Sequence, residues 1–441
     1  MFSNFRQTEE YLNQLIDYER GHPMPRARGK PNFQRLIRAL KAANLWKAPP
    51  ITIHIAGTKG KGSTLFYLEA LLAPTQCVVS FMSPHLVSVR ERIRISGKPV
   101  SETTWVEGFN ALHPILEFSR AQSNPLTYFE TTFLLYFWTL FHLKGEIALV
   151  EVGLGGTYDC TNILIPTISV QTPIDYDHTE ILGKSLIQIA RNKAGIIKPR
   201  CPVVIGRQKP NIERMLCRIS SERHSRAMIL GRDFNGRETD HGFWDYWHKG
   251  EIRFERLHLR AWGRHQQDNA ATALCIALLL EKFGIHLEEA KIRRRLGRVT
   301  LPGRQELLPG SPPILLDVAH NPASFRVLAD FLKEKFCGKK ILLICGMLEQ
   351  KDYRSSLSHV LPWISEAVFS GLSHPRSRSP SDLAAFALSA GVSAEIVEDE
   401  ERAFERVRSR KAFDLVVIAG SFVLAGAYLR WKQSPSDANV P

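Results

Sequence analysis

The sequence predicts an α/β fold with two domains: a larger N-terminal domain built on a central, mostly parallel sheet, and a smaller C-terminal Rossmann-like domain. Two observations predict this fold. Short apolar runs alternate with longer helical patterns along most of the 441 residues, which is typical of parallel sheets covered by helices. The alternation is interrupted at GRVTLPGR (297–304) and then resumes. We therefore expect one domain over residues 1–298 and a second over residues 299–435.

The N-terminal series begins with apolar, often β-branched runs that are short enough to be buried strands. Longer helical patterns lie between these runs. A polar stretch, Arg207–Arg260, is expected to contain an extra antiparallel element, and the Ala- and Leu-rich stretch Asp268–Phe283 a buried helix. The expected strands are Ile51–Ile55, Val78–Phe81, Ile147–Glu151, Ile168–Gln171 and Val203–Ile205, and the expected helices include Phe33–Leu45, Ser63–Leu72 and Tyr128–Leu143.

The C-terminal series repeats the pattern after Arg298. One of its helices is predicted to open at Ser379, because a cap residue is followed by proline and then by Asp382 in the first turn. The expected strands are Ile314–Asp317, Ile341–Cys345, Ala367–Ser370 and Leu415–Ala419.

Composition limits the classes of protein. No apolar run approaches the roughly 20 residues of a membrane-spanning helix, and the first residues are too polar for a secretory signal, so we expect a cytoplasmic protein with no membrane partner. The seven scattered cysteines form no CxxC pair and are expected to be reduced. The formal net charge of +14 favours an anionic partner, which is either nucleic acid or a small polyanionic substrate.

The strongest local signal is the segment Ile51–Thr64, in which a β-branched strand leads through a glycine-rich turn to Lys61. Glycines allow backbone N–H groups to approach phosphate oxygens, and the following helix N-terminus favours negative charge. Lys61 can reach the β- and γ-phosphates, and a hydroxyl can meet Mg²⁺. The alternative is an ordinary glycine-rich turn, since the loop is shorter than the usual P-loop. The predicted phosphate-binding residues are Gly57, Thr58, Gly60, Lys61, Gly62, Ser63 and Thr64.

Three polar residues follow predicted strands of the same sheet. Ser83 and His178 come after strands, and Glu151 ends one. The carboxyl ends of parallel strands line the ligand crevice of such sheets, so these side chains are candidates for holding a divalent ion near a triphosphate. Taken singly, a Ser or His in a loop is more often a structural residue.

Ten short segments, in order along nearly the whole chain, resemble the folylpolyglutamate synthase and dihydrofolate synthase branch of the Mur ligase superfamily. Each segment alone is weak evidence, whereas the ordered set is specific. The segments are GTKGKGST (57–64), SPHLVSVRERIRISG (83–97), LTYFETTF (126–133), VEVGLGGTYDCTNI (150–163), DHTEILG (177–183), NKAGIIK (192–198), NAATA (269–273), LPGR (301–304), LDVAHNP (316–322) and AGSF (419–422).

The resemblance implies an ATP-dependent ligase whose N-terminal, P-loop-type domain binds ATP and whose active site lies between the two domains. Such an enzyme adds L-glutamate to the carboxylate of a folate or dihydropteroate through an acyl phosphate, as folylpolyglutamate synthase with or without dihydrofolate synthase activity. It also implies two Mg²⁺ sites, a carbamylated Lys193, a monovalent cation as a further candidate ligand, and a monomer. The implied roles are catalysis for Lys61, Lys193 and His178; metal binding for Ser83, Glu151 and His178; nucleotide binding for Asn269, Arg304, Asp317 and His320; and substrate binding for Tyr128, Phe129, Glu130, Tyr158 and Asp159.

Some positions depart from the common bacterial pattern of this family, and two rival functions stay open. Thr157 stands where Arg is frequent, Asn192 where Glu is common, Gln350 where Asp is usual and Val423 where His is familiar. These departures concern which acid is accepted. The rivals are a Mur-type amino-acid ligase acting on a different acid, and a P-loop NTPase that binds nucleic acid. Basic residues cluster within 26–30, 293–298 and 406–411. These clusters lack interleaved aromatic residues, which argues against nucleic acid, so none is expected as a partner.

Overall fold

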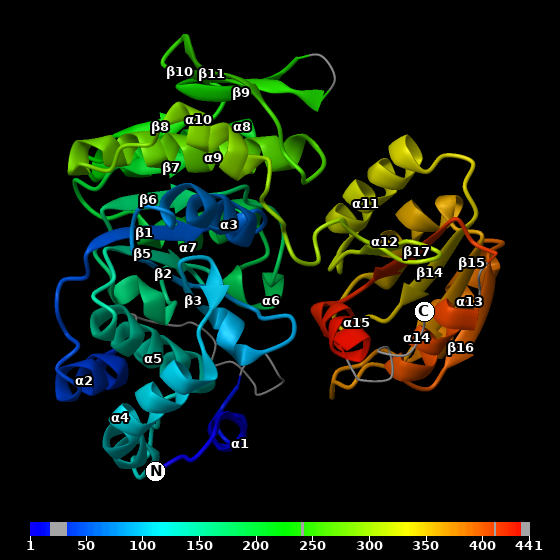
Figure 1. The fold of residues 1–441 in the computed structure, drawn as a ribbon, viewed down its shortest axis with the longest axis horizontal. Helices are drawn as coiled ribbons and strands as arrows, with labels where there is room; N and C mark the ends of the chain where they lie inside the picture. Colours follow the sequence, from blue (N-terminus) through cyan, green and yellow to red (C-terminus); the bar gives the residue numbers. More distant parts are fainter. Residues whose placement is uncertain (18–32, 240–241, 410–411, 434–441) are drawn as a thin grey trace.

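The computed structural model describes residues 1–17, 33–239, 242–409 and 412–433. Its elements form a larger unit that runs to α10 (Glu289–Leu296) and a smaller unit that begins at β12 (Glu306–Leu308). Figure 1 shows the two units side by side. The predicted α/β class, with two parallel-rich sheets, is confirmed. The predicted domain boundary after residue 298 stays a prediction. Residue 435, the predicted end of the second domain, lies outside the described residues.

An eight-stranded sheet forms the centre of the larger unit. Six neighbouring strands are parallel, and a two-strand antiparallel extension follows β2. All five predicted strands are present, whereas β3, β4 and β8 were not predicted. In spatial order the strands are β4 (Lys98–Pro99), β3 (Ile93–Ile95), β2 (Val78–Phe81), β5 (Ile147–Glu151), β1 (Ile51–Ala56), β6 (Ile168–Gln171), β7 (Val203–Ile205) and β8 (Ala227–Ile229).

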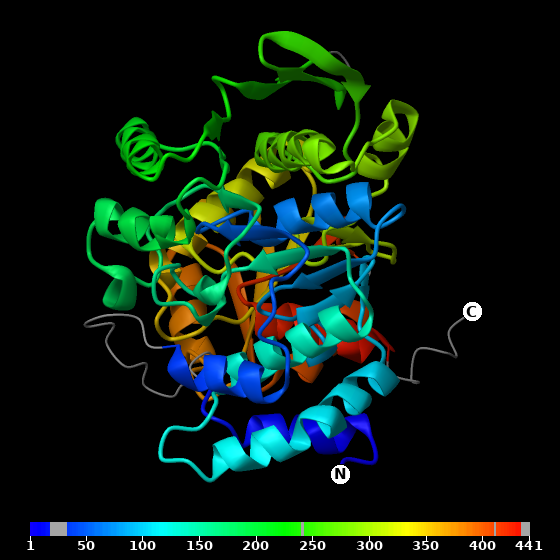
Figure 2. The same cartoon turned by 90° about the vertical axis from the view of Figure 1, so that its left-hand side faces the viewer.

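The stretch Arg207–Arg260 contains the predicted antiparallel element as a three-stranded sheet, together with helix α8 and strand β8, which were not predicted. This sheet lies at the end of the larger unit that is remote from α1 (Figures 1 and 2). It consists of β9 (Phe234–Glu238), β10 (Trp244–His248) and β11 (Glu251–Leu257). The helices of the larger unit are α1 (Phe5–Asn13), α2 (Gln34–Ala42), α3 (Lys61–Leu72), α4 (Glu102–Arg120), α5 (Tyr128–His142), α6 (Thr179–Leu182), α7 (Leu186–Lys193), α8 (Pro210–Glu222), α9 (Arg264–Leu279) and α10.

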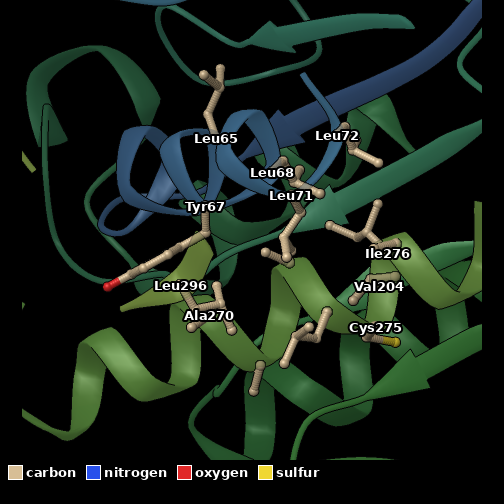
Figure 3. Packing of buried hydrophobic residues seen from close by; sticks show 14 of the residues in the cluster. Leu65, Tyr67, Leu68, Leu71, Leu72, Val204, Ala270, Cys275, Ile276 and Leu296 are labelled. Carbon is tan, nitrogen blue, oxygen red and sulfur yellow. The ribbon is translucent and has the colours of Figure 1, made fainter. Parts of the chain in front are cut away.

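Helix α3, which follows the predicted phosphate loop, is held on both faces. Leucines of α3 pack against the buried, Ala-rich helix α9 and against Leu296 of α10 (Figure 3). Leu68, Leu71 and Leu72 are fully buried there. Because burying each such side chain stabilises the fold by about 1.5–3 kcal/mol, the start of α3 is a firmly positioned point of the structure.

The smaller unit is a six-stranded sheet with helices packed on it. Five of its strands are parallel, and β12 adds to one edge as an antiparallel strand. Helix α15 lies on the side of this unit that faces the larger one (Figure 1). The strands are β12, β13 (Ile314–Leu316), β17 (Leu415–Ala419), β14 (Ile341–Cys345), β15 (Glu366–Ser370) and β16 (Ser393–Val397), and the helices are α11 (Pro322–Lys335), α12 (Tyr353–Val360), α13 (Pro380–Ser389), α14 (Glu400–Ser409) and α15 (Phe422–Gln433).

In the part of the chain that the structure describes, no helix combines the length and apolar character that crossing a membrane requires.

Candidate active site

The glycine-rich loop connects β1 to α3 as the sequence predicts. Gly60 has a left-handed φ of 81°, and α3 begins at the next residue, Lys61. The backbone N–H groups of Thr58 and Lys59 donate to the carbonyl of Pro173 at 2.9 and 3.2 Å, which ties the loop to the segment after β6. The Oγ1 of Thr64 is buried without a hydrogen-bond partner among the described residues. The loop is therefore anchored at its start and carries an unpaired hydroxyl at the helix.

Gly60 also lies against Asn269 of α9, since a Cβ at Gly60 would overlap with the Asn269 side-chain oxygen. The amide of Asn269 donates in turn to Gln266 Oε1 at 3.1 Å. The predicted nucleotide-binding Asn269 thus borders the glycine-rich loop.

We expect Gly60→Ala to lower the free energy of unfolding by about 1–3 kcal/mol, because the new methyl adds a steric overlap to an unfavourable left-handed backbone. Gly97→Ala is the matched control, because Gly97 has a similar φ of 86° and open space around it. It should cost only about 1 kcal/mol in urea unfolding. Equal losses in the two variants would show that the contact with Asn269 is unimportant.

Glu151, at the end of β5, faces the glycine-rich loop from the neighbouring strand. Its register partner on β1 is Ile55, two residues before Gly57. Oε1 lies 3.6 Å from the Lys61 Nζ, and Oε2 is buried without a hydrogen-bond partner in the described part of the chain. Burial raises the pKa of Glu151, and Lys61, the backbone N–H of Ser83 and the Arg304 guanidinium oppose that rise. A buried carboxylate with a free oxygen at this place suits a cationic ligand.

Lys193, the last residue of α7, is the second lysine at the loop. Its Nζ donates to the Gly57 carbonyl at 2.9 Å, and the side chain is almost fully buried. Burial and, to a smaller extent, the charge of Lys61 lower the pKa of Lys193 to about 7, against the opposing effects of Asp177 and Asp159. A substantial fraction of this amine is therefore neutral near pH 7.

A lysine with a lowered pKa makes stability depend on pH. Its pKa is about 7 in the fold and about 10.5 in the unfolded chain, so the unfolded chain binds more protons between these values and stability rises with pH there. In buffer free of carbon dioxide, the free energy of unfolding should rise by about 2 kcal/mol more in wild type than in Lys193→Met between about pH 7 and about pH 9. Parallel pH profiles of the two proteins would contradict this prediction.

His178 lies outside the contacts of Glu151. It has a left-handed φ of 46°, and its imidazole nitrogens lie 3.7 Å from Asp177 Oδ2 and 3.8 Å from Glu180 Oε1. Burial lowers the pKa of His178, with Asp177 opposing the shift. No group of three or more His, Cys, Asp and Glu side chains among the described residues is placed to hold a metal ion by itself. The predicted metal role of His178 stays a prediction.

Asp177 is a further candidate site residue that the sequence analysis did not single out. Burial raises the pKa of Asp177, but nearby positive groups outweigh burial and the net shift is downward. Those groups come from both units: His178 and Lys61 from the larger one, and Lys351 and His320 from the smaller one. Asp177 stands in the segment DHTEILG beside the predicted His178, so the motif itself was the available signal.

Of the predicted nucleotide residues of the smaller unit, Asp317 and His320 follow β13, and Arg304 precedes β12. The carboxylate of Asp317 accepts the backbone N–H groups of Gln305 (2.8 Å) and Ala319 (2.7 Å), and burial raises its pKa to about 6. The Nδ1 of His320 lies 2.9 Å from the Val318 carbonyl, and burial lowers the pKa of His320 to about 4. The Arg304 guanidinium lies 5.0 Å from the ring of Phe422.

The five predicted substrate residues divide by their surroundings. Tyr158 is 40% exposed, whereas Tyr128 is buried with the Arg92 guanidinium 5.1 Å from its ring. Phe129 lies beside Gly153, where a Cβ would come within 2.5 Å of its ring. Glu130 forms a capping box with Thr127 and an ion pair of 2.8 Å with Arg35.

Asp159 organises the loop after β5. It accepts the Leu154 N–H at 2.8 Å and the Thr161 N–H at 3.0 Å. In the same loop, the N–H and hydroxyl of Thr157 both donate to the Asn192 carbonyl, at 2.9 and 2.8 Å. Two of the positions that depart from the family pattern, Thr157 and Asn192, therefore contact each other next to Lys193.

Comparison with known proteins identifies the class. Residues 303–422 match the family model described as the Mur ligase, glutamate ligase domain. The chain is 31% identical over 403 residues to the dihydrofolate synthase/folylpolyglutamate synthase of Bacillus subtilis (strain 168), a match that covers 89% of this chain and 93% of that protein. These matches define the class as an ATP-dependent ligase that forms carbon–nitrogen bonds. The chain belongs to the dihydrofolate synthase/folylpolyglutamate synthase family.

Solved structures agree with this assignment. E. coli FolC in complex with DHPP and ADP is 28% identical with a TM-score of 0.83, and the match covers 97% of both chains. A bifunctional folylpolyglutamate synthase/dihydrofolate synthase with Mn, AMPPNP and L-glutamate bound is 29% identical with a TM-score of 0.82, over 97% of this chain and 98% of that one.

Proposed function

We propose that this ligase adds L-glutamate to the carboxylate of a folate or of dihydropteroate, and that an acyl phosphate connects the two halves of the reaction. The observation that carries the proposal is the grouping of Lys61, Glu151 and Lys193 around one glycine-rich loop at the carboxyl ends of parallel strands. The ADP and DHPP bound in E. coli FolC, and the AMPPNP and L-glutamate bound in the bifunctional enzyme, support it.

The residues at the loop fit a nucleotide with a divalent metal ion. Two buried oxygens, Glu151 Oε2 and Thr64 Oγ1, lack hydrogen-bond partners among the described residues, and oxygen ligands are what Mg²⁺ prefers. Glu151 and Ser83 would hold the metal, with His178 as the third predicted ligand. When bound, Mg²⁺ neutralises negative charge on the phosphate oxygens. A monovalent cation stays a further prediction.

The chain's own residues would act mainly by positioning and by neutralising charge. The acid carboxylate attacks the γ-phosphorus, and the bond to the β,γ-bridging oxygen breaks to release ADP. The amine of glutamate then attacks the acyl carbon, phosphate leaves, and the amine loses a proton. Lys61 and Arg304 would stabilise the phosphoryl oxygens, while Asn269, Asp317 and His320 would hold the nucleotide. Tyr128, Phe129, Glu130, Tyr158 and Asp159 would border the pterin.

Lys193 has a distinct role in this proposal. Its neutral amine adds to carbon dioxide, a new C–N bond forms, and a proton is released to solvent. The resulting carbamate is anionic and faces the same loop as Glu151. It would turn a repulsive cation into a group that favours a metal ion.

The experiment combines ATP, Mg²⁺ and L-glutamate with a panel of pteroates and reduced folates, and measures nucleotide products and product masses. We expect ADP and phosphate in equal amounts, because Lys61 and Glu151 lie at the phosphate loop. Reduced folates should gain glutamate, and dihydropteroate is the test of a second activity. AMP as the stoichiometric product would overturn the acyl phosphate. If dihydropteroate gains glutamate and no folate in the panel does, the proposed folylpolyglutamate synthase activity is wrong.

The assay also separates the rivals. An amino-acid ligase for a different acid would leave every pteroate unchanged, and an NTPase that binds nucleic acid would be stimulated by polynucleotide instead of by glutamate with a pteroate. That the enzyme acts as a cytoplasmic monomer without nucleic acid stays a prediction.

A further inference from the structure

The segment after β2 forms a short arm whose shape is fixed by one carboxylate. We call residues 84–88 the arm. Glu91 accepts the backbone N–H groups of Leu86 (2.9 Å), Val87 (2.8 Å) and Ser88 (2.8 Å). The arm is closed at its base, because the Met82 N–H donates to the Arg92 carbonyl at 3.0 Å. Three charge-assisted hydrogen bonds to one carboxylate hold this backbone in a single conformation.

The tip of the arm reaches the smaller unit. Leu86 packs against that unit's core beside Val318, and a Cβ at Gly303 would lie 3.4 Å from Leu86 Cδ1. At Gly426, on helix α15, an added Cβ would overlap with the carbonyl oxygen of Leu86. Nearby, the Arg430 guanidinium donates to the Val87 carbonyl at 3.4 Å. Only glycine at position 426 leaves room for the arm in this arrangement.

Both ends of this contact continue into the candidate active site. At the base of the arm, the backbone N–H of Ser83 is one of the groups that lower the pKa of Glu151. At the tip, Gly303 directly precedes Arg304, whose charge acts on the same Glu151 carboxylate from the other unit. The arm thus connects the surroundings of Glu151 with Gly303, the residue before Arg304.

We propose that the contact between Leu86 and Gly426 is a positioning device, which sets the place of the smaller unit so that the charge of Arg304 acts on Glu151. Leu86, Glu91 and Gly426 are positioning residues in this scheme, since each acts through its contacts with the arm. The inference rests on the proposed roles of Glu151 and Arg304.

Gly426→Ala tests the device from the smaller unit. Alanine is favoured over glycine inside a helix, so the unit itself should fold as well as before or better. The displaced arm should lower kcat at least tenfold. It should also shift or broaden the distance between spin labels on Phe118→Cys and the exposed Cys337, in full-length protein whose four half-buried cysteines are replaced by serine. Gln433→Ala, an exposed position on the same helix, is the matched control and should change neither.

The distance is measured without substrates, so it reports on the device even if the proposed reaction is wrong. Wild-type kcat and a wild-type distance distribution in Gly426→Ala would overturn the inference. If Gly426→Ala does not fold, Glu91→Gln and Leu86→Ala test the same contact from the larger unit. Glu91→Gln places a donor against backbone N–H groups and should lower kcat severalfold. Unchanged kcat and unchanged distances in both variants would also overturn the inference.

Discussion

Lys61→Ala should lower the turnover of the ligase on the order of 10³-fold, the usual size of the loss when a charge-stabilising group is removed from an active site. Lys61 is the first residue of α3, and its Nζ lies 3.6 Å from the carboxylate of Glu151. The same ammonium is the cation of the loop nearest to a bound triphosphate in the proposed reaction. Its loss therefore removes charge that stabilises the transferring phosphoryl group.

The fold should survive this change, because α3 is held by its buried leucines and not by the lysine. The measurements are steady-state turnover of ADP formation and the midpoint of thermal unfolding. Lys59→Ala is the matched control, since Lys59 belongs to the same loop but forms an ion pair of 3.0 Å with Asp175. It should lose much less activity. A fully active Lys61→Ala enzyme would contradict the proposed phosphate-binding role of the loop.

The parts of the fold that depend on local pattern were predicted from sequence. Strands β1, β2, β5, β6 and β7 are continuous apolar runs, and the glycine-rich turn with Lys61 follows β1 as expected. Strands β12 and β16 were missed because exposed or half-exposed residues interrupt their apolar residues, whereas β8 was missed although Ala227–Leu230 is a short apolar run. Whether the predicted site residues perform their roles is still a question for experiment.

The missed parts of the site depend on contacts between distant segments. Asp177 becomes a candidate only because Lys351 and His320 of the smaller unit approach it. The sequence gives no reason for a glycine at position 426 of a helix. Only the position of the Leu86 carbonyl explains why a side chain is excluded there. Neither contact can be predicted from the spacing of residues in the sequence, because each depends on how the two units are placed relative to each other.

Lys193→Ala should lower turnover roughly 10²-fold, and acetate or another short carboxylic acid should restore part of it. The reason lies in the amine's surroundings. Burial and the nearby Lys61 lower its pKa to about 7, so the neutral form that reacts with carbon dioxide is available near neutral pH. An ammonium beside a metal ion would be repelled, whereas a carbamate would be attracted. The small acid would replace the missing carboxylate in the space left by the side chain.

The same chemistry predicts that wild-type turnover falls when bicarbonate and carbon dioxide are removed, and that it recovers when bicarbonate is added with Mg²⁺ present. Mass spectrometry of protein trapped by carbamate-specific alkylation measures the modification directly. Lys198→Ala is the matched control, because Lys198 lies close by but donates to the Asn162 side chain and carbonyl at 2.8 and 3.0 Å. Its activity should not respond to acetate. Wild-type turnover of Lys193→Ala would contradict this role. So would a Lys193→Ala enzyme that acetate leaves unchanged, together with a wild-type enzyme that does not respond to bicarbonate. In either case Lys193 would have only the structural role of a donor to the Gly57 carbonyl.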